Sequence, residues 1–296
     1  MIKKSGFLQT CAFLVRNLKR HRSFATAATS GKEVTVDLME DSCQGVAVIN
    51  MNRPERKNAL SVNFSSELYN VIEGIKYDSS IRVVILRSLV KNIFCAGADL
   101  KERPTLSNMQ VHAFVNTLRH LANTIEDLPV PVIAALDGFA VGGGLEIALA
   151  CDLRVAASNA KMGLVETSLA IIPGAGGTQR LPRLIGVPKA KELIYTSRLL
   201  NGQNAFDIGL VNNVVEQNPN GDAAYLASLE LAKEILPNGP IGVQMAKKAI
   251  NKGSQVDIHT GCFIEEACYS KVITTNDRME GLQAFKEKRK PMYLGE

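Results

Sequence analysis

Short apolar runs alternate with longer amphipathic stretches through the middle of the chain. Four of these runs are typical of buried strands, because they are continuous and shorter than a stable helix. They lie at residues 46–49, 83–86, 131–136 and 153–157. Between them, apolar positions recur at helical spacing over about 61–77 and 107–126. Strands that alternate with helices predict an α/β fold with a layered core, and not a sandwich or a bundle.

From about residue 189 the pattern becomes mainly helical. Long helices are predicted over 222–236, 240–252 and 257–288, with few strand signals between them. We therefore divide the chain into four parts. They are a leader (1–24), a linker (25–40), an α/β core (41–220) and a helical C-terminal region (221–296).

The leader differs in kind from the rest of the chain. It contains six Lys and Arg residues and no acidic residue, and it lacks the continuous apolar block of a secretory signal. This composition is typical of a mitochondrial transit peptide, with a disordered tail of no targeting role as the alternative. Residues 22–25 resemble a matrix-protease cleavage site, so we expect a mature start near Ala25 and a location in the mitochondrial matrix.

The charge of the remaining chain is almost balanced. Removal of residues 1–24 leaves 28 basic against 29 acidic residues, and the formal charge falls from +5 to −1. With no Trp and 5 % aromatic residues, the chain gives no general argument for nucleic-acid binding. The apolar stretch 128–150 is interrupted by two prolines, two acids and three consecutive glycines, so we expect no membrane span.

Several catalytic classes lack their characteristic motifs. The sequence has no G-x-S-x-G elbow, no Walker lysine motif and no H-E-x-x-H. The glycine runs at 142–144 and 174–177 miss the dinucleotide fingerprint, because Gln179 stands where its third glycine is needed. The six cysteines form no C-x-x-C pair, and no Cys/His cluster has zinc-site spacing, so we expect no metal.

Two glutamates stand in apolar surroundings. Glu146 lies in GGGLEIALA (142–150), and Glu166 lies twenty residues later in KMGLVET (161–167). Burial raises the pKa of a carboxyl group, and a pair of such groups can share acid and base duties near neutral pH. The alternative is structural, with Glu146 as a favourable charge at a helix start and Glu166 in a surface loop.

The glycine run 142–144 is predicted to open a helix. Exposed N–H groups at a helix N-terminus suit a developing negative oxygen, and the small-residue turn 95–99 offers a second donor. Two N–H groups that converge on one carbonyl oxygen form an oxyanion hole. Ordinary tight turns are the alternative for both segments.

Five motifs in order give the chain a resemblance to a known family. They are NRPERKNAL (52–60), FCAGADL (94–100), DGFAVGGGLEIALACDLRVA (137–156), GLVET (163–167) and PGAGGTQRLPR (173–183). Together they resemble the crotonase (enoyl-CoA hydratase) superfamily, over about residues 46–296. The resemblance implies a spiral of ββα turns followed by a helical C-terminal trimerisation region.

The resemblance also implies the roles of individual residues. The N–H groups of Ala98 and Gly143 are expected to hold a thioester oxygen. Glu146 and Glu166 are expected to hold one water, which Glu146 directs at the β-carbon while Glu166 exchanges a proton with the α-carbon. Expected substrate-binding positions are Ala96, Asp99, Leu100, Lys101, Gly142 and Gly174. Expected contacts to the phosphates of coenzyme A are Arg56, Lys57, Lys101 and, across a subunit boundary, Lys288, with plain solvated charge as the alternative for each.

The implied activity is addition of water to a short-chain enoyl-CoA thioester. Coenzyme A is then part of the substrate, and no separate cofactor is expected. Two glutamates favour hydration over isomerisation, the alternative reaction of this fold. The acyl group stays open between a general short-chain enoyl group and a glutaconyl-type group, whose distal carboxylate needs a donor such as Lys101 or Arg103. Trimers or dimers of trimers are the implied assembly.

Two other functions compete with hydration. In an RNA-binding relative within this family the segment that matches 57–71 is rich in lysine, whereas here it reads KNALSVNFSSELYNV, with one lysine. We therefore expect weak and strongly salt-dependent RNA binding at most. A catalytically inactive scaffold of the same fold is the other alternative, and it is disfavoured because every expected chemical position is filled.

Overall fold

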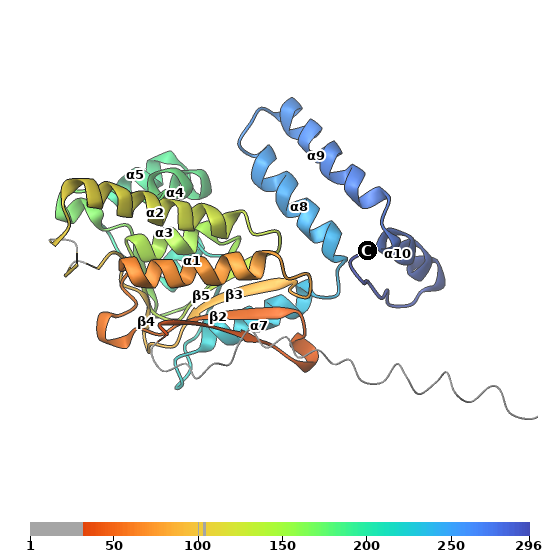
Figure 1. The fold of residues 1–296 in the computed structure, drawn as a ribbon, viewed down its shortest axis with the longest axis horizontal. Helices are drawn as coiled ribbons and strands as arrows, with labels where there is room; N and C mark the ends of the chain where they lie inside the picture. The colour runs from red at the N-terminus through yellow and green to blue at the C-terminus, as the bar shows by residue number, and fades with distance from the viewer. Residues whose placement is uncertain (1–31, 100, 103–104) are drawn as a thin grey trace, which may run out of the picture. The chain divides into compact units, whose positions relative to one another are not determined.

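The computed structural model describes residues 32–99, 101–102 and 105–296 (Figure 1). The predicted transit peptide, residues 25–31 of the predicted linker, Leu100 and Arg103 lie outside the described residues. All the elements below belong to one compact unit, Glu33–Glu296.

Two sheets form the centre of this unit. The larger has six strands in the order β1 (Val34–Leu38), β2 (Val46–Met51), β3 (Val83–Ser88), β5 (Val132–Leu136), β7 (Leu153–Ala157) and β10 (Asn213–Val215). Its strands are parallel except for the edge strand β1, which pairs antiparallel with β2. The smaller sheet consists of β4 (Ile93–Cys95), β6 (Phe139–Val141), β8 (Lys161–Gly163) and β9 (Leu200–Asn201).

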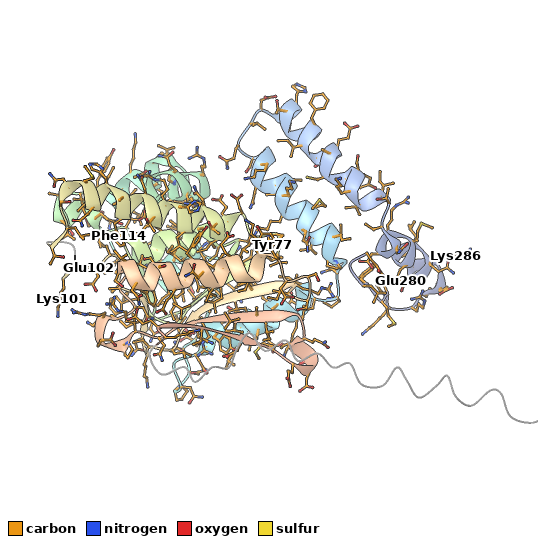
Figure 2. All side chains as sticks on the ribbon, in the orientation of Figure 1. Tyr77, Lys101, Glu102, Phe114, Glu280 and Lys286 are labelled. Atoms are coloured by element: carbon orange, nitrogen blue, oxygen red, sulfur yellow. The ribbon has the colours of Figure 1, made fainter. Side chains whose placement is uncertain are left out.

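The helices of the core begin with α1 (Val62–Lys76) and α2 (Asn108–Glu126), which start where serine caps predict a start. Ser61 accepts a hydrogen bond from the Phe64 N–H, and Ser107 forms a capping box with Gln110. At its other end α1 reaches Tyr77, whose side chain is exposed (Figure 2). The remaining core helices are α3 (Gly143–Ala150), α4 (Gly177–Ile185), α5 (Val187–Thr196), α6 (Gly202–Asp207) and α7 (Ala223–Ile235).

The large sheet is buried on both faces. Ala47, Ile49 and Met51 of β2 belong to the core cluster that also contains the apolar residues of α1, α2 and α3, whereas Val46 and Val48 pack with α7. Successive residues of a strand point to opposite faces, so a strand covered on both sides reads as a continuous apolar run. Figure 1 shows the same layering, with α1 to α3 on one side of the sheet and α7 on the other.

Three helices follow the core, α8 (Pro240–Gly253), α9 (Ile258–Ile273) and α10 (Asn276–Glu287). Helix α8 is attached to the core by an ion pair, because Lys247 Nζ lies 2.7 Å from Asp152 Oδ2 and donates to the Val130 carbonyl at 2.9 Å. Within the part of the chain that is described, no helix is long and apolar enough to cross a membrane.

The predicted strands and helices are confirmed, but the short strands β4, β6, β8, β9 and β10 are not among those that the sequence predicts. Two further differences lie at the two ends of the chain. Val34–Leu38 form β1 inside the range 25–40 that the sequence assigns to a linker. They read VTVDL, in which apolar and polar residues alternate as in a strand with one apolar face, and they pair with β2 at the edge of the sheet. The predicted helical stretch 257–288 is two helices. Thr275 caps α10 by accepting from the Arg278 N–H, which ends the continuity of the apolar pattern between α9 and α10.

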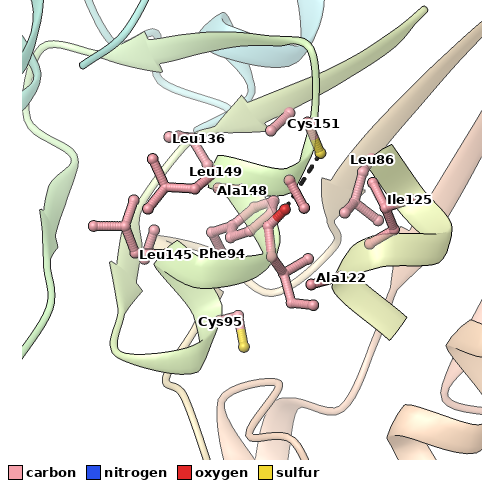
Figure 3. Packing of buried hydrophobic residues seen from close by; sticks show 14 of the residues in the cluster. Leu86, Phe94, Cys95, Ala122, Ile125, Leu136, Leu145, Ala148, Leu149 and Cys151 are labelled. Carbon is pink, nitrogen blue, oxygen red and sulfur yellow. Dashed lines mark hydrogen bonds between the residues drawn. The ribbon is translucent and has the colours of Figure 1, made fainter. Parts of the chain in front are cut away.

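Helix α3 is completely buried and lies directly on β4. Figure 3 shows this packing around α3, with Phe94 and Cys95 from β4 and Ala122 and Ile125 from α2. At Gly144 an added Cβ would lie 2.3 Å from the Cys95 carbonyl oxygen, closer than a real Cβ contact allows. Only glycine lets the first turn of α3 come so close to the end of β4.

We predict that Gly144→Ala lowers the thermal midpoint of unfolding. The added methyl group meets backbone and not a movable side chain, so relief requires a shift of α3 or β4, at a cost of about 1–3 kcal/mol. The measurement is the thermal midpoint at fixed protein concentration. The control is Gly242→Ala in α8, where an added Cβ has nothing within 4 Å and the midpoint is expected to hold or rise. Equal midpoints for the two variants would contradict the prediction.

Candidate active site

In the turn after β4, the backbone N–H of Ala98 points away from the neighbouring segment at Leu60. Leu60 and Ala98 form an isolated parallel bridge, in which the Leu60 N–H donates to the Gly97 carbonyl at 2.7 Å and the Asp99 N–H donates to the Leu60 carbonyl at 3.0 Å. In such a bridge the groups on both sides of Ala98 face Leu60, so the N–H of Ala98 itself points the opposite way.

The N-terminus of α3 lies on that opposite side. Gly143 is the first helical residue, so its N–H has no carbonyl partner within the helix. An added Cβ on Gly97 would lie 3.4 Å from the Gly143 nitrogen, and one on Gly143 would lie 3.8 Å from the Ala98 nitrogen. The two amides that the sequence predicts as an oxyanion hole therefore lie side by side.

Both amides belong to residues that line a cavity of about 110 Å³. Its apolar wall comes from α2 and the segment after Glu166. Its lining residues are Ala96, Gly97, Ala98, Phe114, Val115, Leu118, Gly142, Gly143, Glu146, Val165, Glu166, Leu169, Ile171, Ile172, Gly174 and Ala175. Glu146 and Glu166 are the charged members of this set, so the cavity joins the predicted glutamate pair to the predicted amide pair.

Glu146 is held by the start of another helix. Its carboxylate is 3 % exposed, and its Oε1 accepts the Ala175 N–H at 2.8 Å and the Gly177 N–H at 2.7 Å. Gly177 is the first residue of α4, so the carboxylate sits at the positive end of that helix. Burial raises the pKa of Glu146, and the two amides and the positive charge of Arg180 oppose this rise without cancelling it.

Glu166 faces the same space from a short 3-10 helix, η4 (Glu166–Leu169). It is 9 % exposed, and an added Cβ on Gly142 would lie 3.3 Å from its Oε1. Gly142 has φ +52°, a left-handed conformation that glycine adopts without strain. The next residue, Thr167, donates to the Ile194 carbonyl and anchors η4 to α5. Glu166 is thus buried, and the alternative of a surface loop does not hold.

A buried polar cluster holds the turn that carries Ala98. The side chain of Asn58 is fully buried, donates to Ser88 Oγ at 2.7 Å and to the Phe94 carbonyl at 3.0 Å, and accepts from the Arg53 N–H at 2.7 Å. Arg53 in turn donates to Asp99 Oδ2 at 3.1 Å. Through these contacts Asn58 and Arg53 hold the loop 52–60 against the end of β4.

The other predicted substrate-binding positions divide into two groups. Ala96, Gly142 and Gly174 line the cavity, whereas Asp99 and Lys101 are not among its described lining residues. The Asp99 carboxylate turns to Arg53 and to the Lys101 N–H. Burial acts to raise the pKa of Asp99, but hydrogen bonds from the Lys101 and Glu102 amides and the charge of Arg53 outweigh it, so that the pKa is lowered.

Three of the predicted phosphate contacts gather beside the same turn. The Lys57 carbonyl accepts the Ala96 N–H at 3.1 Å, which brings the loop with Arg56 and Lys57 against the segment that leads to Lys101. Lys288 caps the end of α10 and is exposed. In Figure 2 Lys101 and Lys286 of α10 lie at opposite sides of the view.

The sequence did not predict the amides that hold Glu146 or the apolar wall of the cavity. The amides of Ala175 and Gly177 were not expected to bind Glu146, although PGAGGTQRLPR (173–183) was recognised as a motif. The apolar wall formed by Phe114 and Leu118 was also missed, and the spacing of four residues on α2 is the signal that could have indicated it. Over the residues that the structure describes, no group of three His, Cys, Asp or Glu side chains could hold a metal.

Comparison with known proteins agrees with this arrangement. The enoyl-CoA hydratase/isomerase family matches residues 41–296. The mouse protein "Methylglutaconyl-CoA hydratase, mitochondrial" is 54 % identical over 281 residues, which cover 95 % of this chain and 90 % of that one. The mouse "Enoyl-CoA hydratase domain-containing protein 2, mitochondrial" is 54 % identical over 269 residues, 91 % of each chain. The stretches FCAGADLKER, LACDLRVAAS, EEACY and AFKEKR indicate the same two kinds of relative.

Solved structures also share the fold. The crystal structure of an enoyl-CoA hydratase from Bacillus anthracis superposes with a TM-score of 0.85 at 50 % sequence identity and covers 90 % of this chain and 100 % of that one. The predicted crotonase-type α/β fold with a helical C-terminal region is therefore confirmed. With a family match that spans most of the sequence, this chain belongs to the enoyl-CoA hydratase/isomerase family.

Proposed function

We propose that the protein adds water across the α,β double bond of a short-chain enoyl-CoA thioester. The observation that carries this proposal is one small cavity lined by two buried glutamates and by Ala98 and Gly143, whose backbone amides lie side by side. The family match and the hydratase names of the relatives support the same reaction.

The amides of Ala98 and Gly143 hold the thioester oxygen. Their N–H groups donate to it as negative charge develops on the enolate, and the dipole of α3 adds to this stabilisation. Removal of one such donor in other enzymes costs on the order of 10²–10³ in rate. The donors belong to the backbone, so their position depends on the close contact of α3 with β4.

The two glutamates hold the water and move its protons. Glu146 accepts a proton from the water as its oxygen attacks the β-carbon, and Glu166 donates a proton to the α-carbon. The net result is one hydroxyl group and one hydrogen added across the double bond. An isomerase needs one acid to shuttle a proton, so the pair favours hydration over isomerisation.

The acyl group and the coenzyme are bound by different surfaces. The apolar wall of Phe114, Val115 and Leu118 receives a short acyl chain, and Ala96, Gly142 and Gly174 line the narrow passage beside it. Arg56, Lys57 and Lys101 contact the phosphates of coenzyme A, since they gather beside the turn that holds the thioester. No cofactor beyond the substrate's own coenzyme A takes part. The names of the relatives support methylglutaconyl-CoA as a substrate beside unbranched enoyl-CoA thioesters.

The protein acts in the mitochondrial matrix. The basic, acid-free composition of residues 1–24 and the word "mitochondrial" in the names of both mouse relatives support this location. Residues 1–24 are the transit peptide, and the mature chain begins near Ala25.

The protein assembles as a trimer or a dimer of trimers through its C-terminal helices. Exposed apolar side chains support this assembly, since Met279, Leu282 and Phe285 form a stripe on α10 and are 59 %, 54 % and 87 % exposed. Exposed apolar side chains that lie together on one helix are typical of a surface that another chain covers. In such an assembly Lys288 contacts the coenzyme bound to a neighbouring chain.

RNA binding is at most a weak second property. Within the segment 57–71, the exposed side chains are Lys57, Val62, Asn63, Ser66 and Asn70, so Lys57 is the one exposed charge. A surface with a single exposed lysine releases few counterions from phosphates.

We predict that Glu146→Gln and Glu166→Gln each lower the hydration rate of crotonyl-CoA by about 10²–10⁴-fold, because each removes one proton-transfer group. Hydration is followed as loss of the enoyl-thioester absorbance, with methylglutaconyl-CoA as the second substrate and protein that begins near Ala25. The control is Glu73→Gln, which removes a carboxylate on α1 that pairs with Lys76 outside the cavity. Retained activity in either cavity variant refutes its role, and better use of crotonyl-CoA refutes the narrower methylglutaconyl assignment.

We predict that Leu282→Asp with Phe285→Asp breaks the assembly. Two charges in a buried apolar contact are costly, so light scattering should change from the mass of three or six chains to that of one. The matched control is Tyr77→Asp, another exposed aromatic residue at the end of α1, which should leave the mass unchanged. A wild-type protein that is monomeric would rule out the proposed assembly.

We predict that fluorescence anisotropy detects only weak RNA binding, which disappears between low and physiological salt. A variant with Asn63→Lys, Ser66→Lys and Asn70→Lys should bind more tightly, because it places three positive charges on the exposed face of α1. Nanomolar and sequence-selective binding of the wild type at physiological salt would overturn this expectation.

A further inference from the structure

Arg180 lies behind the Glu146 carboxylate and outside the cavity. It belongs to α4, three residues after Gly177, and its side chain is 14 % exposed. Its guanidinium group donates to Glu126 Oε2 through Nε at 3.0 Å and through Nη2 at 2.5 Å, and to Asn123 Oδ1 at 2.8 Å. Helix α2 thus fixes this arginine from one side.

From the other side the same guanidinium group holds the turn that binds Glu146. Its Nη1 donates to the Ala175 carbonyl at 3.1 Å, while the N–H groups of Ala175 and Gly177 donate to Glu146 Oε1. Between them Gly176 has φ +106°, and an added Cβ there would lie 2.3 Å from Arg180 Nη1. The turn is therefore folded around the arginine, and glycine at 176 makes room for it.

Arg180 also acts on Glu146 through its charge. The positive charge of Arg180 lowers the pKa of Glu146 against the larger effect of burial, which raises it. The other titratable groups near Glu146 come from three elements. They are Glu166 across the cavity, Cys95 on β4, and Glu126 and Arg119 on α2. Burial raises the pKa of Cys95 to about 12, so this thiol stays neutral, and Glu126 partly offsets the charge of Arg180.

We propose that Arg180 is a positioning residue for Glu146, because it fixes the turn 174–177 whose amides orient the carboxylate and places a positive charge behind it. This role rests on the proposed function of Glu146 as the base. Arg119 assists from the solvent side, since its Nε and Nη2 donate to the Gly174 carbonyl at 3.2 Å and 3.0 Å. The Gly174 carbonyl and the Ala175 N–H belong to one peptide group, so this contact strengthens the donor that faces Glu146.

The same helix offers a matched control. Arg183 lies three residues beyond Arg180 and carries the same charge, but its guanidinium group contacts the carbonyl and side chain of Gln179 and the side chain of Gln255. Arg183 has no described contact with the turn 174–177. Arg183→Met therefore removes one arginine from α4 without touching the support of Glu146.

The test compares Arg180→Met, Arg180→Lys and Arg183→Met in the full assembly. Arg180→Met should lower kcat by about 10²-fold with little change in KM, because a displaced base loses alignment while the cavity stays intact. A base must be unprotonated, and loss of the positive charge raises the pKa of Glu146. The acidic limb of kcat/KM, which lies above pH 4.5 in the wild type, should thus move to higher pH.

The other variants separate charge from geometry. Arg180→Lys keeps the charge but cannot bridge Glu126 and the Ala175 carbonyl, so its acidic limb should stay near that of the wild type while kcat remains reduced. Arg183→Met should match the wild type in both respects. A folded Arg180→Met protein with the wild-type kcat and pH profile would overturn the proposal. If Arg180→Met does not fold, a wild-type kcat in Arg180→Lys would overturn it.

A second readout does not depend on turnover and so separates this proposal from the proposed function. Because its folded-state pKa is raised, Glu146 lowers stability once it ionises, and the thermal midpoint of the wild type relative to Glu146→Gln falls as pH rises from 4.5 through that pKa. In the Arg180→Met background, measured against Arg180→Met with Glu146→Gln, this fall should begin at the same pH and extend to a higher pH. An unchanged pH window would refute the role of Arg180, whether or not the protein is a hydratase.

Discussion

The site depends on a carboxylate that is taken out of water and held by backbone amides. A buried carboxylate without partners is too costly to keep, and Glu146 meets this constraint with the two N–H groups at the start of α4. It stands in the first turn of α3 and at the N-terminus of α4, so two helix dipoles favour its negative charge. Burial still prevails and leaves the pKa raised, which suits the base that we propose Glu146 to be.

Close backbone approach is the second constraint, and it explains where the glycines lie. Gly144 allows α3 to touch β4, Gly142 leaves space for the Glu166 carboxylate, and Gly176 leaves space for Arg180. The first two contacts join segments that are distant in sequence, whereas Gly176 and Arg180 lie four residues apart at the start of α4. The glycine runs are therefore not flexible linkers but the positions where helices and strands meet without side chains between them. They fix the two amides and the two carboxylates around one small space.

The sequence predicts the core well because its signals are local. Continuous apolar runs give β2, β3, β5 and β7, and Ser61 and Ser107 mark helix starts through contacts within three residues. β1 gives a different signal, because its five residues VTVDL alternate between apolar and polar and form no continuous apolar run. The two glutamates could be predicted as site residues from the sequence, because a carboxylate in an apolar stretch is costly to bury and therefore indicates a function. The role of Arg180 could not be predicted, because it depends on a contact with Glu126, which lies 54 residues earlier in the chain.

The contrast between Arg180 and the surface cations shows how position decides the effect of a charge. Lys57, Lys101 and Lys288 are exposed, so water screens their charges. Arg180 is largely buried and acts at all times on a neighbour that cannot leave. Glu126 neutralises this buried charge and orients the guanidinium group of Arg180 toward the turn 174–177. Glu126 of α2, Glu146 of α3 and Arg180 of α4 thus form one connected group. The excess of basic residues in the whole chain lies in residues 1–24. In the core, by contrast, the few charges that shape the site are those of buried side chains such as Glu146 and Arg180.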